Sequence, residues 1–437
     1  MRIPRCPALV AAVLLLASCA GPADDAGDGR PPPGPPAVLR VPAAFPTIQQ
    51  AVDRARPGDL VLVGPGVYRE SVRVATGGVV LRGADRNRTV IDGEFRRANG
   101  ITVTGGGSAV ENLTVRNHLA NGLLFTGVTD TARQSGAGGG TEYERLDTRR
   151  HPPLKGFRAA YVTAHNNALY GIYAFDARDG LIEHAYASGH ADSGIYVGQC
   201  RPCRTVVREN TVEHNAVGLE VTNASEELYF LGNRARRNRV GAAVNSDDLE
   251  SLAPQHRALF AGNTITDNND ADSPEQADGG FGIGIGVGGG QGNVLERNLV
   301  AGNRRAGILL TDVVGYPVSG NRVRGNRVTG NGADLVLSAP GRASGNCFTG
   351  NGEHPRPQAA PADPEGAPGG DCEATAPPVA GRAPVAAAPP GRSFRLVTAP
   401  PPQPGMPAAA TAPARPARAA RAMPPAEPAR YRLPAGR

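Results

Sequence analysis

The chain has 437 residues, of which 58 are glycine and 40 are proline, and its formal net charge is +6. The length alone would allow two or three domains, but both ends differ in composition from the middle, so the foldable part is shorter. Much of the basic excess lies in the C-terminal segment, outside the predicted fold. The charge therefore does not predict a nucleic-acid partner, and we expect none.

The first predicted element is an export signal at residues 1–18. Arg2 and Arg5 precede an apolar run at 8–17, which is too short to span a bilayer as a helix. The tetrapeptide Leu-Ala-Ser-Cys that ends at Cys19 resembles a bacterial lipobox, which implies cleavage before Cys19 and lipidation of its sulfur. We therefore expect an extracytoplasmic lipoprotein anchored to the cell membrane; ordinary secretion with a chance cysteine is the alternative.

Both flanks of the foldable part are predicted to lack fixed structure. Residues 19–40 are rich in proline and glycine, which predicts a flexible tether between membrane and domain. Residues 353–437 are dominated by alanine, proline and arginine, a composition that buries too little apolar surface to offset the entropy of ordering. We expect this tail to be disordered and the folded domain to span 41–352.

The folded part is predicted to open with an amphipathic helix in the sequence FPTIQQAVDRARPGD, which has an apolar face formed by Ile48, Ala51, Val52 and Ala55. Short apolar strands follow in LVLVG, YRESVRV, GVVLRG and TVIDG. A stack of strands exposes its core and its strand edges at the ends unless something covers them. The helix is therefore predicted to cap the N-terminal end.

Glycines that precede short alternating runs recur about every 23 residues in the middle of the chain, at Gly171, Gly194, Gly218 and Gly241. A period in the low twenties, with turn residues between the runs, is typical of a solenoid. Leucine-rich repeats share the period but need leucines that are missing here. The sequence predicts an all-β fold, a right-handed parallel β-helix in which each repeat forms one coil.

Pairs of asparagines five residues apart accompany the repeats. Equivalent positions of neighbouring coils lie about 4.8 Å apart, so a residue type that recurs at one position forms a ladder. Asparagine suits the corners because it tolerates left-handed backbone and its amide can bond to the amides above and below. We interpret these pairs as scaffold: Asn210 and Asn215, Asn233 and Asn238, Asn263 and Asn268, Asn298 and Asn303, and Asn326 and Asn331.

Two groups of residues carry a family resemblance. PTIQQAVDRARPGDLVLVGPGVYRE resembles the opening of pectin-lyase-like β-helix proteins, and the glycine-phased repeats resemble those of carbohydrate-binding proteins and sugar hydrolases. SGIYVGQC at 193–200 and VGLEVTN at 217–223 resemble a bacterial group of exported parallel β-helix repeat proteins. The resemblance covers roughly 41–352 and implies the fold, but it supplies no activity.

The alternation in GIYA, GIYV and GLEV directs Tyr173, Tyr196 and Glu220 outward at one position of successive coils. Aromatic rings offer flat apolar faces to pyranoses, and a carboxylate binds their hydroxyls. Together with the nearby Tyr170, this strip predicts a carbohydrate-binding face. The alternative is that the stacked tyrosines only stabilise the surface of the sheet.

The candidate catalytic residues are Asp192, His190 and Lys155. A histidine and a carboxylate can act as base and acid in lyase or hydrolase chemistry, and both occur in GHADSG. His190 also occupies the position of a ladder asparagine, so a corner role is the alternative and Asp192 is the more exposed candidate. Lys155 lies in an insertion at 129–157, and insertions in solenoids often form the binding face.

Four cysteines remain outside the leader and the lipidation site: Cys200, Cys203, Cys347 and Cys372. An even number in an oxidising compartment favours two disulfides, Cys200 with Cys203 and Cys347 with Cys372, although four cysteines allow three connectivities. A zinc site at Cys200 and Cys203 is the alternative.

A second insertion, at 262–290, contains carboxylates that are able to bind Ca²⁺ through oxygen ligands. Their spacing lacks the regularity of a dedicated calcium loop, so a solvated acidic loop is the preferred interpretation and we expect no cofactor. These residues are Asp267, Asp270, Asp272, Glu275 and Asp278.

The sequence therefore predicts a monomeric, lipid-anchored β-helix protein that binds a cell-envelope or environmental polysaccharide. A polysaccharide lyase, epimerase or hydrolase is the enzyme alternative, although the motifs of pectate lyases, polygalacturonases and alginate epimerases are missing from the sequence. A third alternative is a non-catalytic envelope-assembly or metalloprotein maturation factor, by resemblance to the periplasmic copper-site maturation protein of nitrous oxide reductase. Resemblance of fold does not decide among the three.

Overall fold

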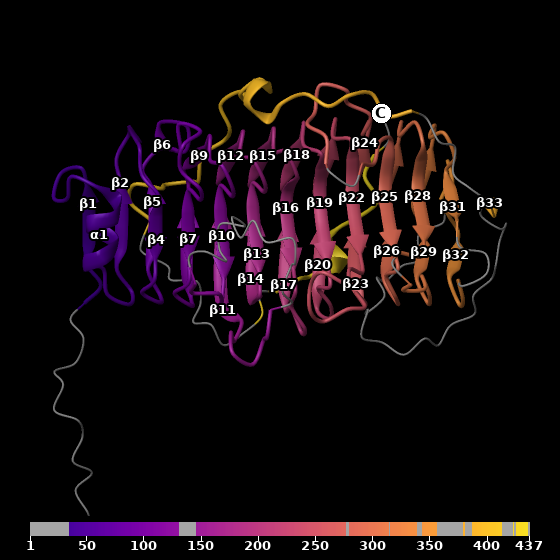
Figure 1. Ribbon diagram of the computed structural model, residues 1–437, viewed down its shortest axis with the longest axis horizontal. Coiled ribbons are helices and arrows are strands. Elements are labelled where there is room, and N and C mark those ends of the chain that lie inside the picture. The colour runs from indigo at the N-terminus through magenta and orange to yellow at the C-terminus, as the bar shows by residue number, and fades with distance from the viewer. Residues whose placement is uncertain are drawn as a thin grey trace, which may run out of the picture. The chain divides into compact units, whose positions relative to one another are not determined.

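The computed structural model describes residues 35–130, 146–276, 279–313, 315–338, 343–355, 379–380, 387–412, 423 and 425–435. Over these residues the chain winds into coils that each add a short strand to one of three parallel sheets (Figure 1). The predicted all-β parallel β-helix is confirmed. Residues 1–18 and Cys19 lie outside the described residues, so the leader and the lipid anchor stay predictions. No helix within the described ranges is long and apolar enough to cross a membrane.

The three sheets contain 12, 11 and 10 strands. In spatial order, the 12-stranded sheet consists of β1 (Val38–Val41), β2 (Leu60–Val63), β5 (Val80–Gly83), β8 (Ser108–Glu111), β11 (Leu154–Ala160), β14 (Ala177–Glu183), β17 (Thr205–Arg208), β20 (Leu228–Leu231), β23 (Ala258–Ala261), β26 (Val294–Glu296), β29 (Arg322–Arg324) and β32 (Cys347–Thr349).

The 11-stranded sheet consists of β33 (Val379–Ala380), β31 (Leu335–Leu337), β28 (Ala306–Thr311), β25 (Ile283–Gly288), β22 (Val240–Asn245), β19 (Val217–Thr222), β16 (Ser193–Gly198), β13 (Ile172–Phe175), β10 (Leu123–Thr126), β7 (Ile101–Val103) and β4 (Val72–Val74). The 10-stranded sheet consists of β3 (Gly66–Tyr68), β6 (Thr89–Asp92), β9 (Thr114–Arg116), β12 (Thr163–His165), β15 (Tyr186–Ser188), β18 (Thr211–Glu213), β21 (Arg234–Arg236), β24 (Thr264–Thr266), β27 (Leu299–Ala301) and β30 (Arg327–Thr329).

The predicted capping helix is present as α1 (Ile48–Arg54), which lies at the N-terminal end of the stack (Figure 1). The hydroxyl of Thr47 accepts the backbone N–H of Gln50, and the carboxylate of Glu70 accepts that of Ile48, so both groups cap the first turn. The apolar face of α1 is buried against the first coils, which confirms the predicted end cover. The stack begins at Val38, slightly before the predicted boundary at 41.

Inward-facing apolar side chains form a continuous core between the three sheets. Ile172, Ile195 and Leu219 lie on successive strands in one register and are fully buried. Aromatic rings stack in the same way, since the rings of Phe230 and Phe260 lie 4.5 Å apart and almost parallel. Each coil thus places an apolar side chain over a similar one. Full burial of each large apolar side chain stabilises the fold by about 1.5–3 kcal/mol.

The predicted asparagine ladders are confirmed as two continuous hydrogen-bonded columns. At the corner between the 12- and 10-stranded sheets, the backbone N–H and side-chain amide of Asn210 both donate to Oδ1 of Asn233, at 3.1 and 2.9 Å. Asn233 donates in the same way to Asn263, at 2.9 and 3.0 Å. The second column repeats this pattern at the next corner, through Asn215, Asn238, Asn268, Asn303 and Asn331.

The left-handed backbone lies one residue before each ladder asparagine, and not at the asparagine as expected. Glu209 has φ 55° and His214 has φ 61°, and glycines with positive φ precede Asn233 and Asn263. The left-handed residue turns the chain, and the asparagine that follows points its amide into the buried corner. This separation of the two tasks explains why glutamate, histidine and glycine alternate at the first position while asparagine recurs at the second.

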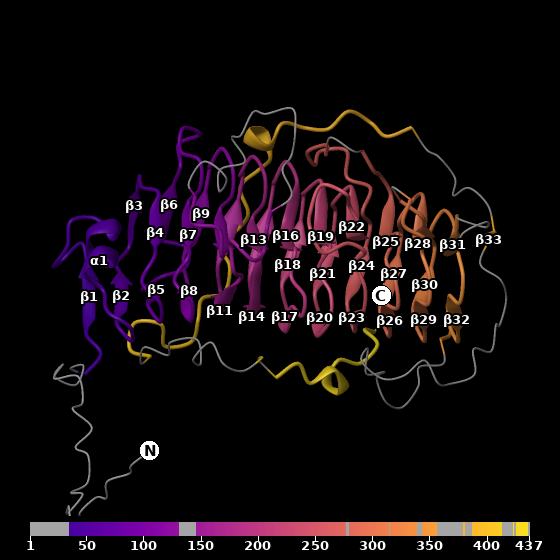
Figure 2. The same cartoon turned by 60° about the horizontal axis from the view of Figure 1, so that its bottom comes forward.

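The described parts of the C-terminal tail lie against the β-helix, while the disorder expected for the tail as a whole stays a prediction. Segment 387–412 lies alongside the coils (Figures 1 and 2), and its carbonyl groups accept hydrogen bonds from the β-helix. Arg239 donates to Pro389 at 2.6 Å, Asn166 to Val397 at 2.9 Å and Arg86 to Pro404 at 2.8 Å.

Segment 425–435 contacts the outer face of the 12-stranded sheet. Ala426 packs with Val206 and Leu259, and the hydroxyl of Tyr431 donates to Glu209 at 3.0 Å. The composition of the tail does not reveal this docking, because the partner of each of these contacts belongs to the β-helix. The entropic cost of ordering the tail is offset by contacts with a surface that is already folded.

We predict that Asn233→Ala destabilises the protein by about 3 kcal/mol, because the two buried donors of Asn210 and the carbonyl of Val207 lose their partner. Urea-induced unfolding measures the change. Asn87→Ala removes an exposed amide and is the matched control, with an expected change below about 1 kcal/mol. Equal losses in the two variants would show that the ladder is not a major source of stability.

Candidate functional site

A groove of about 460 Å³ crosses the outer face of the 11-stranded sheet, over β16, β19, β22, β25 and β28. Residues from the segment between β22 and β23, among them Leu249, form part of its wall. Residues from the segment between β24 and β25, among them Gln276, form another part. Both segments interrupt the regular repeat, so the coils form the floor of the groove and the insertions form its walls.

The floor follows from the register of the sheet. Tyr173, Tyr196, Glu220, Ala243, Gly286 and Leu309 occupy one position on six successive strands. Ala243 and Gly286 have small side chains or none, so the surface is hollow between Glu220 and Leu309. The hollow therefore results from two small residues, Ala243 and Gly286, at one register position of the sheet.

The predicted tyrosine strip is present as a packed cluster. The rings of Tyr173 and Tyr196 stack at 4.7 Å with an interplanar angle of 18°. Tyr170 meets the ring of Tyr196 edge-on at 4.8 Å and lies 4.5 Å from Tyr173. Tyr170 and Tyr173 are partly exposed, whereas Tyr196 is 4% exposed, so ring surface is open to a ligand on the first two only.

Tyr196 and Glu220 are both buried, and the segment after β22 folds back over Tyr196. Its Glu250 is 6% exposed and accepts a hydrogen bond from the hydroxyl of Tyr196. Burial raises the pKa of the Glu250 carboxyl from its usual 4.5 to about 8. Its second oxygen, Oε2, is buried and has no hydrogen-bond partner among the described residues. The sequence analysis missed Glu250, and no local pattern in SDDLE distinguishes it from a surface acid.

Asp192 and Glu220 also line the groove and meet at one hydroxyl. Ser193 Oγ contacts Oδ1 of Asp192 at 3.2 Å and a carboxylate oxygen of Glu220. The side-chain amide of Gln276, from the wall, donates to Asp192 at 2.9 Å. The groove therefore brings together Tyr170, Asp192, Tyr196 and Glu220 from the predicted site residues, with Tyr173 stacked behind them.

The other two predicted catalytic residues lie elsewhere. His190 is fully buried in the second ladder, where Asn167 donates its backbone N–H to Nδ1 and Nε2 contacts the carbonyl of Ala164. It therefore takes the corner role and cannot reach a ligand. Lys155 is exposed on β11, in the 12-stranded sheet, whereas the groove lies on the 11-stranded sheet. Neither residue meets Asp192.

The cysteines follow the prediction where the structure describes them. Cys200 and Cys203 form a disulfide, which rules out the alternative of a zinc site at this pair. Cys372 lies outside the described residues, so its pairing with Cys347 stays a prediction.

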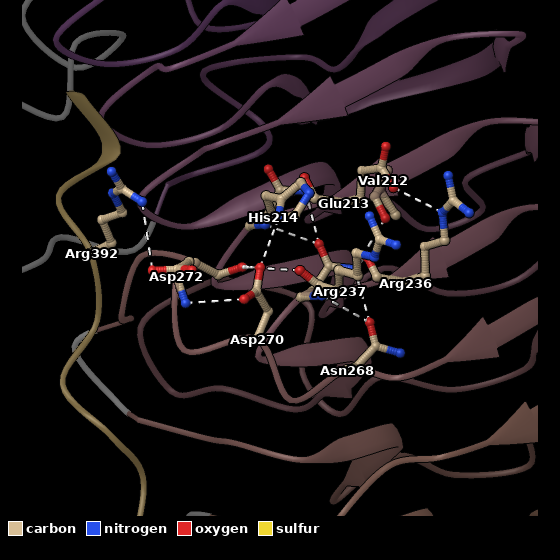
Figure 3. Close-up of polar contacts among 12 residues, drawn as sticks. Val212, Glu213, His214, Arg236, Arg237, Asn268, Asp270, Asp272 and Arg392 are labelled. Carbon is tan, nitrogen blue, oxygen red and sulfur yellow. Dashed lines mark hydrogen bonds and ion pairs between the residues drawn. The ribbon is translucent and has the colours of Figure 1, made fainter. Parts of the chain in front are cut away.

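The acidic insertion distributes its carboxylates among separate partners. Figure 3 shows His214 directed toward Asp270, with Nδ1 at 2.6 Å from Oδ2, and Arg392 directed toward Asp272 at 3.5 Å. Glu275 accepts the backbone N–H of Gly391 at 3.1 Å. Among the described residues there is no cluster of three side chains able to hold a metal ion, and Asp278 lies outside them. These contacts join the wall of the groove to the C-terminal segment.

Three parallel sheets wound from successive coils define a parallel β-helix protein. More specifically, the chain belongs to the right handed beta helix region family, whose model matches residues 77–252 and 251–355. The predicted family and fold are thus confirmed. A search of curated proteins found no match.

Solved structures share the fold at low identity. The A-module of mannuronan C-5 epimerase AlgE4 from Azotobacter vinelandii is 16% identical with a TM-score of 0.45, over 70% of this chain and 89% of that chain. An alginate lyase from Paenibacillus sp. str. FPU-7 is 15% identical with a TM-score of 0.39, over 70% and 99%.

Tailspike protein 2 from the Escherichia coli O157:H7 bacteriophage CAB120 is 10% identical with a TM-score of 0.45, over 65% of this chain and only 36% of that chain. At these identities and TM-scores, the likenesses support no conclusion about what this chain binds.

We predict that His190→Asn reduces the loss of stability in acid. Burial lowers the pKa of His190 from its usual 6.5 to about 3, so the unfolded chain takes up a proton that the folded chain resists. The contribution of His190 to stability is present above pH 6.5 and is lost as the pH falls toward 3. Asparagine keeps the ladder bonds and does not titrate. Urea unfolding of both proteins at neutral and acidic pH measures the difference, and parallel losses would contradict the prediction.

Proposed function

We propose that this protein is a lipid-anchored extracytoplasmic glycan-binding protein that holds a cell-envelope or environmental polysaccharide in the groove of its 11-stranded sheet. The observation that carries the proposal is the groove itself. Its polar side chains come from successive coils, so a chain laid across the strands meets a new set of groups about every 4.8 Å.

The chemistry of the lining suits a sugar chain. Tyr170 and Tyr173 offer partly exposed rings at one end, and pyranose faces pack well on such rings. Asn245, Thr222 and Thr311 line the floor and walls with donors and acceptors for hydroxyl groups. The groove is open, so a polymer can pass through it without a free chain end. Export and lipidation, which the leader predicts, would place the groove outside the cytoplasm, where such polymers occur.

We expect Gly286→Phe to abolish glycan binding without unfolding the protein. A Cβ at Gly286 would meet its nearest side-chain atom, on Ile283, at 3.7 Å, which is ordinary contact, and the larger ring would fill the hollow beside Ala243. A glycan array read with the full-length protein should lose its wild-type signals by at least about tenfold. Lys155→Ala, on another sheet, is the control and should bind as wild type does. Unchanged binding by Gly286→Phe would place the glycan elsewhere.

A second candidate function, cleavage of the bound glycan, is favoured by one observation. The Tyr196 hydroxyl and the Glu250 carboxyl are hydrogen-bonded beside the groove, and the raised pKa of Glu250 keeps a proton on it near neutral pH. A carboxylic acid that stays protonated near neutral pH can act as a general acid toward a leaving sugar oxygen, directly or through the tyrosine. Asp192 and Glu220 are the carboxylates that remain for the role of base or nucleophile.

If the protein cleaves its glycan, Glu250→Gln should lower kcat by about 100-fold or more while the KM changes little, because glutamine accepts the Tyr196 bond but carries no acidic proton. Asp192→Asn should have a comparable effect. Release of reducing ends and of unsaturated uronate from the glycans bound on the array measures turnover. Glu209→Gln, at an exposed corner, is the matched control. Wild-type binding without product would restrict the protein to recognition.

A further inference from the structure

The charged side chains that line the groove are mostly acidic. Asp192, Glu220, Asp247 and Glu250 contribute carboxyl groups, whereas Arg305 is the single cation among the described lining residues. This balance is opposite to the positive formal charge of the whole chain. The groove is therefore a local acidic surface on a basic protein, and its charge bears on which glycans can enter it.

Two of these carboxyl groups lie on one wall and receive neutral donors. Asp247 accepts the backbone N–H of Leu249, and Glu250 accepts the hydroxyl of Tyr196. A neutral donor does not compensate the charge of a carboxylate at Asp247, whereas the raised pKa of Glu250 keeps that carboxyl group protonated near neutral pH. In addition, Oε2 of Glu250 is buried without a partner among the described residues, although a buried carboxyl oxygen ordinarily accepts a hydrogen bond. The wall therefore holds a carboxyl group with one unpaired oxygen, to which a ligand is able to supply a hydrogen bond.

An anionic ligand is poorly suited to this surface. A polyuronate would bring one carboxylate per sugar toward Asp192, Glu220 and Asp247, and like charges brought together in a partly desolvated groove repel each other. An ammonium group has the opposite sign and three N–H donors, which match carboxylate oxygens.

From this geometry we infer that the groove takes a glycan with free, protonated amino groups, such as a glucosamine polymer, and discriminates against polyuronates. The inference rests on the proposed glycan-binding function and specifies its ligand class. A sugar is favoured over a basic peptide because Tyr170, against which Tyr173 packs, presents partly exposed ring surface in the same lining as Asp192 and Glu220.

Titration calorimetry on the full-length protein tests the inference with four matched hexamers: glucosamine, N-acetylglucosamine, galacturonate and lysine. In mildly acidic buffer, where the amines are protonated, the glucosamine hexamer should bind at least about tenfold more tightly than the acetylated hexamer. The galacturonate hexamer should bind most weakly of the three sugars. The preference for glucosamine should decrease with added salt, because part of it is electrostatic.

A pair of isosteric variants assigns the effect to the groove. Glu220→Gln combined with Asp247→Asn removes two charges at nearly constant shape and should reduce the preference for glucosamine over N-acetylglucosamine to about threefold or less. Glu209→Gln combined with Asp248→Asn, at exposed positions outside the lining, is the control and should keep the preference. Melting temperatures show whether each variant is folded, and the salt dependence of the wild type provides a readout that does not depend on either variant.

The outcomes separate the two proposals. Equal binding of the acetylated and free-amine hexamers, or tighter binding of galacturonate, would overturn the ligand class while the glycan-binding function stands. Lysine hexamer bound as tightly as the glucosamine hexamer would overturn it as well, because charge alone would then account for the affinity. Binding of none of the sugars would defeat both proposals.

Discussion

The hydrogen bonds that join each coil to the next are the constraint on which the rest of the structure depends. Backbone ladders make these bonds along the strands, and side-chain amides continue them through all three corners, where Asn293, Asn321 and Asn346 form the third column. Because every coil is held to its neighbour at the corners as well as along the strands, register is preserved from one strand to the next. A residue type at one position of the repeat therefore becomes a column on the surface or in the core.

The groove is a consequence of that register. Tyr196, Glu220, Ala243 and Gly286 lie in line only because the strands before and after them cannot slip. The corner at residues 209–210 is short and filled by the first ladder, whereas the long segments 246–257 and 267–282 leave the 11-stranded sheet or lead into it. Each segment also contains a residue of a corner column, Gln255 in the first and Asn268 in the second, so the corners stay closed while the remainder of each insertion forms a wall beside that sheet.

Buried polar groups are satisfied to different degrees in three parts of the molecule. In the first ladder the side-chain amide of Asn210 accepts the backbone N–H of Ala185 and donates to the carbonyl of Ile182, so its burial does not cost a hydrogen bond. At the groove, Glu250 is equally buried but has one oxygen without a partner, and its pKa is raised to about 8. A buried oxygen without a hydrogen bond lowers the stability of the fold. This oxygen belongs to a residue that lines the proposed glycan groove. The C-terminal segment adds a third case, in which buried Arg86 donates to carbonyl groups of a chain that docks on it.

The sequence by itself determined the β-helix, the capping helix, the ladder pairs and the disulfide between Cys200 and Cys203, because each depends on residues that repeat or lie close together in the chain. It also identified Tyr170, Tyr173, Tyr196, Asp192 and Glu220, since alternation fixes which side of a strand a residue faces. Only the tertiary structure decided between the catalytic and the corner role of His190, separated Lys155 from the other candidates and brought Glu250 over Tyr196. It also gave the described tail segments a docking surface. These features depend on contacts between residues far apart in sequence, such as Tyr196 with Glu250 and Arg86 with Pro404, and a local pattern holds no information about which distant group will supply a partner.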